Sequence, residues 1–179
     1  MPYGYRRRMT IGQLLPDVRP NPPDHGSERE SLEGFLDFLR ATIIWKAEGL
    51  SDADAARQLL PSPMTISGLI RHLADVERDW FRGDMDGQPD VPQRSTPEDR
   101  DGAFRVTADH SLTDIIADYR AACDESRAVA ARYQLDDRCA RLDHRYSLRW
   151  ILTHMIEETG RHAGHVDILR ELLDGATGE

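Results

Sequence analysis

The stretch MIEETGRHAGHVDILRE, from Met155 to Glu171, has the rhythm of a helix but an unusual composition. Its apolar residues recur every three or four positions, as on one side of an amphipathic helix. Beside that apolar stripe stand an acid and two histidines, Glu158, His162 and His165, where a buried face normally carries Leu or Val. Polar side chains at the edge of a core need partners. This stretch therefore bears on both how the chain packs and what it can bind.

Length and composition limit the classes of protein that this chain can represent. Its 179 residues suffice for one domain with a sizeable core. The formal net charge is -9 and no Lys/Arg cluster follows a predicted helix face, so we expect no nucleic-acid partner. No apolar run approaches the roughly 20 residues of a membrane span, and no signal peptide is apparent. We therefore expect no membrane partner. Because Cys123 and Cys139 cannot make a disulfide framework, we expect a cytoplasmic protein.

Capping residues and glycines predict where the chain is helical. Residues 1–26 are rich in Pro and Gly and lack periodicity, which predicts an extended N-terminal arm before a single domain over residues 27–179. Ser27 and Glu30 have the spacing of a capping box, which begins a helix. Four long helices are predicted: from Ser27 to Gly49, from Thr65 to about Gly83, from Ser111 to about Tyr133, and from after Ser147 to Gly175.

Four long amphipathic helices without a convincing strand predict an all-α protein, a bundle of four antiparallel helices. The connection from Arg82 to Asp109 is dense in Pro, Gly, Asp and Arg and has no sustained period. Connections of this length are often functional. A solvated crossover that joins two parallel neighbouring helices explains the length of this connection equally well. A long crossover also suits a bundle that is not simply up-and-down.

The polar residues of the last helix have the spacing of a metal site. Glu158 and His162 are four residues apart, so they share one helix face and can reach one ion. His72, on the border of the second helix's apolar stripe, offers a third ligand, and three protein ligands leave a position open for water or substrate. Glu77, on the other border of that stripe, is expected to be a surface acid.

Each of these residues also has an interpretation without a metal. His72 alone fits a hydrogen-bonded core histidine, and Glu158 alone fits a salt-bridge partner of Arg161 or His162. Burying Glu and His side by side without a cation leaves costly polar groups, which favours a metal. The residues by themselves leave the two interpretations evenly balanced.

Two segments, GLIRHLADVERDWF and ILTHMIEETGRHAGHVDILRELLDG, resemble the DinB/YfiT-like superfamily, in particular its branch of mycothiol-dependent S-transferases and maleylpyruvate isomerase-like proteins. The similarity extends from about Leu32 to Gly175. It implies a DinB-like four-helix bundle, a homodimer, and a divalent metal, usually zinc but also nickel or another ion. The implied ligands are His72, Glu158 and His162, and a carboxylate at position 158 is typical of the mycothiol-linked branch.

The resemblance also implies a reaction. A small thiol, mycothiol or a similar one, would bind the metal as thiolate and attack an electrophile. The alternatives are a hydrolase or isomerase that uses metal-bound water, and a stress-related binding protein without turnover. His165, often an amide in distant relatives, is the catalytic candidate: it would hydrogen-bond a ligand, shuttle a proton or close the rim of the pocket. We favour the hydrogen bond, because such contacts orient metal ligands.

Overall fold

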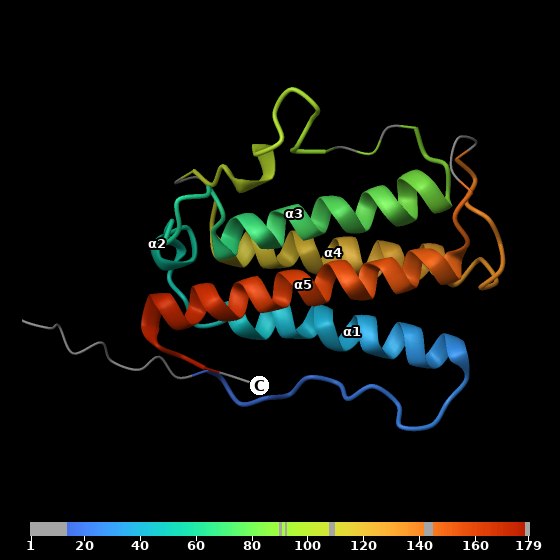
Figure 1. The fold of residues 1–179 in the computed structure, drawn as a ribbon, viewed down its shortest axis with the longest axis horizontal. Helices are drawn as coiled ribbons and strands as arrows, with labels where there is room; N and C mark the ends of the chain where they lie inside the picture. Colours follow the sequence, from blue (N-terminus) through green and yellow to red (C-terminus); the bar gives the residue numbers. More distant parts are fainter. Residues whose placement is uncertain (1–13, 90, 92, 108–109, 142–144, 178–179) are drawn as a thin grey trace, which may run out of the picture.

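Four long helices lie side by side in the computed structural model, which describes residues 14–89, 91, 93–107, 110–141 and 145–177 (Figure 1). They are α1 (Glu28–Ala47), α3 (Ile66–Arg78), α4 (Leu112–Ala130) and α5 (Leu148–Asp174), with a short α2 (Asp52–Ala55) before α3. A π-helical segment, η1 (Asp79–Met85), continues α3, and a 3-10 turn, η2 (Gly102–Phe104), follows later. Within the described ranges the only β-pairing is one isolated bridge, between Arg138 and Ser147, so the predicted all-α class is confirmed. None of the helices described is long and apolar enough to cross a membrane.

Hydroxyl side chains begin the long helices at the predicted positions. The Ser27 hydroxyl accepts from the Glu30 amide, and the Glu30 carboxylate accepts from the Ser27 amide, which completes the capping box. The cap residues of α3, α4 and α5 are Thr65, Ser111 and Ser147. Such caps satisfy amide groups that the first helical turn leaves without partners.

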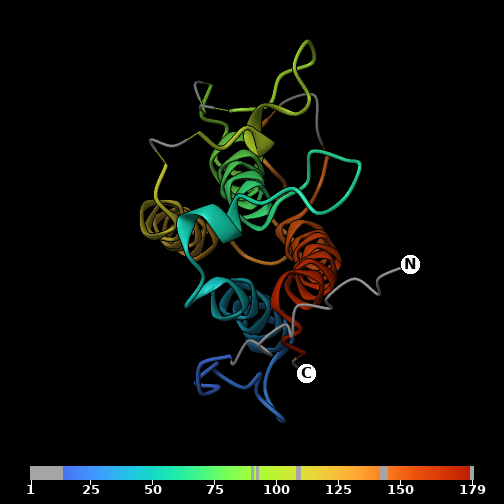
Figure 2. The same ribbon diagram turned by 90° about the vertical axis from the view of Figure 1, so that its left-hand side faces the viewer.

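The helices form two parallel pairs, so the bundle is not simply up-and-down, as the long connection indicated. The expectation that all four helices are antiparallel was wrong. Helix α1 packs most closely on α5 and α3 packs most closely on α4, and each pair runs in one direction (Figure 1). Helices of different pairs run in opposite directions. Seen from one end, α1 and α3 occupy opposite corners of the bundle (Figure 2). This order arises because the chain returns along the whole bundle between α3 and α4.

That return is the connection predicted from Arg82 to Asp109. Its first residues belong to η1, and its residues 90, 92 and 108–109 lie outside the described part. It is fixed to the helices by Arg94. The Arg94 backbone amide and guanidinium donate to Asp75 on α3, and the guanidinium also donates to Asp118 on α4, at 2.6 Å. The crossover therefore joins two parallel neighbours, one of the two interpretations of its length.

The described part of the N-terminal arm, residues 14–26, lies along α1. The Trp45 indole donates to the Leu15 carbonyl at 2.7 Å, and the Arg19 guanidinium lies 4.3 Å from the centre of the Trp45 ring. Residues 1–13 of the predicted arm lie outside the described part. The domain boundary at residue 27 and the homodimer both stay predictions.

A buried ion pair connects α1 and α3 across the bundle. The Arg40 guanidinium donates to both Glu77 carboxylate oxygens, at 2.7 and 2.6 Å, and both residues are almost inaccessible to solvent. The pair contacts Cys123 of one apolar cluster and Phe81 of the other. Glu77 is therefore a core residue, and its prediction as a surface acid was wrong because the helical period does not reveal a partner on another helix.

We expect the Glu77→Ala variant to lose about 3–5 kcal/mol of unfolding free energy, because it leaves the Arg40 charge buried without a partner. Urea unfolding followed by circular dichroism measures the loss. The control is Glu48→Ala, which removes a solvent-exposed pair between Glu48 and Arg120 and should cost no more than about 1 kcal/mol. If Glu77→Ala does not fold, the double variant Arg40→Met/Glu77→Leu should, since it removes both charges. Equal stability of Glu77→Ala and wild type would contradict this account.

Candidate metal centre

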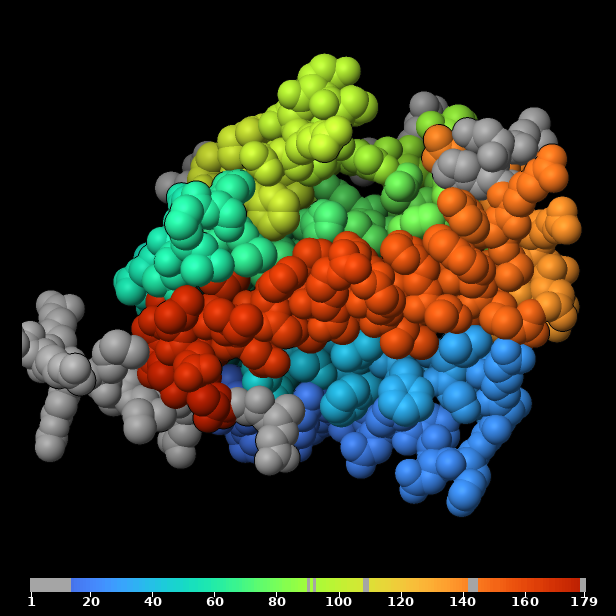
Figure 3. Space-filling model, in the orientation of Figure 1, coloured from blue at the N-terminus to red at the C-terminus, as the bar shows by residue number. Residues whose placement is uncertain are grey.

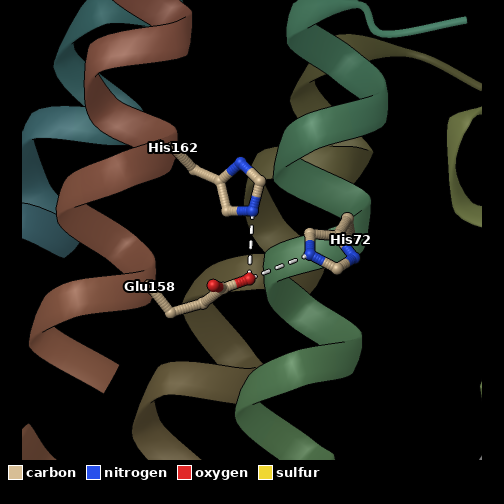
Figure 4. A group of neighbouring side chains, drawn as sticks. All are labelled: His72, Glu158 and His162. Carbon is tan, nitrogen blue, oxygen red and sulfur yellow. Dashed lines mark hydrogen bonds and ion pairs between the residues drawn. The ribbon is translucent and has the colours of Figure 1, made fainter. Parts of the chain in front are cut away.

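His72, Glu158 and His162 meet between α3 and α5, two helices that run in opposite directions (Figure 4). The Glu158 Oε1 atom lies 3.0 Å from His162 Nε2 and 3.3 Å from His72 Nε2. The two imidazole rings meet edge to face, with centroids 4.9 Å apart. Helical geometry explains the contact within α5, because residues four apart are neighbours on a helix surface. The structure thus brings together the three residues predicted as ligands.

The two imidazoles stabilise the charge of the carboxylate. The hydrogen bond from His162 and then that from His72 hold the pKa of Glu158 well below its usual value, although burial opposes this. An ionised carboxylate only accepts hydrogen bonds, so both Nε2 atoms carry hydrogen in this arrangement. Without those hydrogens, the two nitrogens would direct their lone pairs toward the same carboxylate oxygen.

The donor set fits a divalent cation. Two imidazole nitrogens and a carboxylate oxygen are common zinc ligands, and atoms about 2.1 Å from a tetrahedral ion lie about 3.4 Å apart. One donor atom from each of the three side chains can be chosen so that all lie within 4.8 Å of one another, so small side-chain rotations suffice. The side chains are 12–26% exposed, which leaves an approach from solvent for a further ligand.

His165 lies behind His162 and does not join the three donors. Its Nδ1 atom is 3.3 Å from His162 Nδ1, so one ring donates a hydrogen bond to the other. Burial lowers the pKa of His165 below its usual value, and the neighbouring His162 and Arg161 lower it further, which favours the neutral ring. A neutral His165 can accept from His162 Nδ1 whenever the hydrogen of His162 lies on that atom.

Arg161 does not compete for Glu158, because it pairs with Glu157 on the solvent side of α5. Without a metal, Glu158 was expected to pair with Arg161 or with His162, and the structure shows the contact with His162. The second contact, from His72 on another helix, was predicted only as part of a metal site.

The crossover contributes one residue that sequence reasoning missed. The Phe104 ring of η2 stacks on the His72 ring, with centroids 5.7 Å apart and planes 22° apart. The surface is hollowed over α3, between the crossover and α5 (Figure 3). Phe104 lies in a segment without periodicity, so its only signal in the sequence is that it is a large aromatic in a polar connection.

Comparison with known proteins gives a match over most of the chain. The family model described as mycothiol-S-transferase matches residues 31–175, which include all four long helices except the first few residues of α1. Neither a curated protein nor a solved structure matches the chain significantly. The extent of the match agrees with the resemblance seen in the two helical segments, and the chain belongs to the mycothiol S-transferase family.

Proposed function

We propose that the protein is a metal-dependent S-transferase that joins the sulfur of a small thiol, mycothiol or a close analogue, to an electrophile. The observation that carries this proposal is the approach of His72, Glu158 and His162 donor atoms to within 4.8 Å of one another, in a chain of the mycothiol S-transferase family. Family membership supports the thiol, and the donor geometry supports the metal.

In this proposal His72, Glu158 and His162 hold the divalent ion, with zinc the first candidate because it favours nitrogen and oxygen ligands in this number. Two neutral imidazoles and one carboxylate leave the centre with net positive charge, which favours the thiolate form of a thiol bound there. Glu158 stays ionised at neutral pH because the imidazoles beside it stabilise its charge. His165 holds His162 in orientation through the contact between their Nδ1 atoms.

Atoms and charge balance in the proposed transfer of sulfur to the electrophile. The thiol loses its proton to solvent, and a sulfur electron pair forms the new bond to a carbon of the electrophile. The carbon's former partner leaves with the bonding pair, or, in an activated alkene, the displaced π pair takes a proton from water.

The chain's own cysteines do not suit the role of nucleophile. Burial, together with the charge of Glu77, raises the pKa of the Cys123 thiol to about 12, and Cys139 is also buried. The thiolate is the reactive form, so a thiol from solution is the better candidate. Two free cysteines also fit the reducing cytoplasm, where we place the reaction.

We expect His72→Ala, Glu158→Ala and His162→Ala each to abolish tight binding of one zinc ion per chain, measured by calorimetry and by metal analysis of the purified protein. Each loss should exceed the roughly 10–100-fold that removal of a residue hydrogen-bonded to a ligand costs. The control is His25→Ala, which removes an exposed imidazole outside the bundle and should bind zinc as wild type does. Tight zinc binding by Glu158→Ala would rule out the proposed ligand set.

His165→Ala should keep the metal but lower metal affinity or turnover about 10–100-fold, as expected for a residue that orients a ligand. His165→Gln offers a hydrogen-bonding side chain again and should recover part of the loss. If His165→Ala loses the metal while Glu158→Ala keeps it, His165 is the ligand and Glu158 is not.

The thiol is tested with cobalt in place of zinc. Addition of mycothiol should produce a sulfur-to-cobalt absorption band and release a proton, and glutathione or cysteine should do so less well. Mycothiol should then be consumed in a one-to-one ratio with an activated alkene, and Glu158→Ala should show neither band nor turnover. Tight metal binding with no spectral change for any small thiol would instead favour a hydrolase that uses water.

A further inference from the structure

Four aromatic rings continue the face of α3 and α5 that carries the candidate metal centre. They belong to Trp80, Tyr146, Trp150 and His154, which we call the aromatic platform. His154 precedes Glu158 by four residues on α5, so its backbone is about 6 Å from that of Glu158 on the same side of the helix. Trp80 follows His72 at the junction of α3 with η1. The platform therefore begins one helical turn from the carboxylate.

The rings support one another. Tyr146, Trp150 and His154 form a stack, with planes 17° and 19° apart and centroids 4.0 and 5.1 Å apart. Trp80 meets the stack at an angle, with its ring centre 4.7 Å from that of His154 and 5.4 Å from that of Trp150. Offset stacks and edge contacts are the favoured arrangements of aromatic rings, so the platform is a rigid surface.

Core packing explains only part of the platform. Trp80 and Tyr146 pack against the second apolar cluster, but Trp150 belongs to neither cluster and is 42% exposed. Other exposed apolar residues of α5, Ile168 and Leu172, lie further along the helix, beyond His165. Trp150 is therefore left available to a ligand beside the polar centre.

We propose that the aromatic platform binds the body of the electrophile and gives the enzyme a preference for electrophiles that carry an aromatic ring within a few bonds of the reacting carbon. This proposal rests on the proposed S-transferase function. Tyr146 and His154 cover the two faces of Trp150, so the ring of a ligand would meet the open edge of Trp150, an edge-to-face arrangement that aromatic rings favour. The side of the centre toward Phe104 is then left for the thiol.

The preference is tested with two electrophiles of the same chemistry, phenyl vinyl sulfone and methyl vinyl sulfone. In each, sulfur bonds to the terminal carbon, the π pair takes a proton from water, and the thiol proton is released. We expect zinc-loaded protein with mycothiol to have a higher kcat/KM for the phenyl compound, after division by the uncatalysed rates. Trp150→Leu should lower that ratio about 10-fold, mainly through KM, and Trp150→Phe should largely restore it. Ile168→Ala is the matched control and should leave the ratio unchanged.

A second measurement separates this proposal from the transferase function. Calorimetry with ethyl phenyl sulfone, an unreactive analogue, needs neither metal nor thiol. The platform is supported if binding of the analogue weakens about 10-fold in Trp150→Leu and is unchanged in Ile168→Ala. If that binding is seen but no vinyl sulfone is turned over, only the transferase function is refuted. Turnover without preference for the phenyl compound, or equal binding by Trp150→Leu and wild type, would overturn the platform and leave the transferase function standing.

Discussion

The ion pair between Arg40 and Glu77 determines how α3 is rotated in the bundle. Two charges without solvent are tolerated only when they satisfy each other, so Glu77 must face α1 across the core. His72 precedes Glu77 by five residues, which places it about 140° away around the helix. At that angle it lies on the border of the core, where its ring contacts both Glu158 of α5 and Phe104 of the crossover. The contact of His72 with Glu158 therefore depends on a charge pair that takes no part in binding.

The sequence predicted much of this arrangement and left some of it open for physical reasons. Capping residues are local signals, so the helix starts at Ser27 and Ser147 agreed with the structure. The spacing of Glu158 and His162 is local too, and their contact follows from one helix alone. The parallel pairing and the partner of Glu77 depend on segments far apart in the chain, which a period within one helix cannot describe. Phe104 lies in a connection without a hydrophobic period, so no sequence pattern predicted its contact with His72.

The candidate centre shows why polar residues occur at the edge of a core. Each imidazole donates to the same carboxylate oxygen, so Glu158 and the two histidines satisfy one another at partial burial. The same convergence presents three donor atoms to a cation. Along the helices, aromatic rings of α5 and η1 lie on one side of the centre and Phe104 on the other. The two sides of the centre thus differ in chemistry, as suits the proposed reaction between two unlike substrates.

The crossover between η1 and α4 is much longer than its path demands. The helical stretch that it must retrace is about 30 Å long, a distance that about nine residues of extended chain can span. The protein uses residues 86–111. Among its described residues, Arg94, Phe104 and the carbonyl of Arg105 contact α3. Insertions and deletions between those anchors would leave the four helices unchanged, so the chain has a place where new substrate ranges can evolve without a cost to the fold.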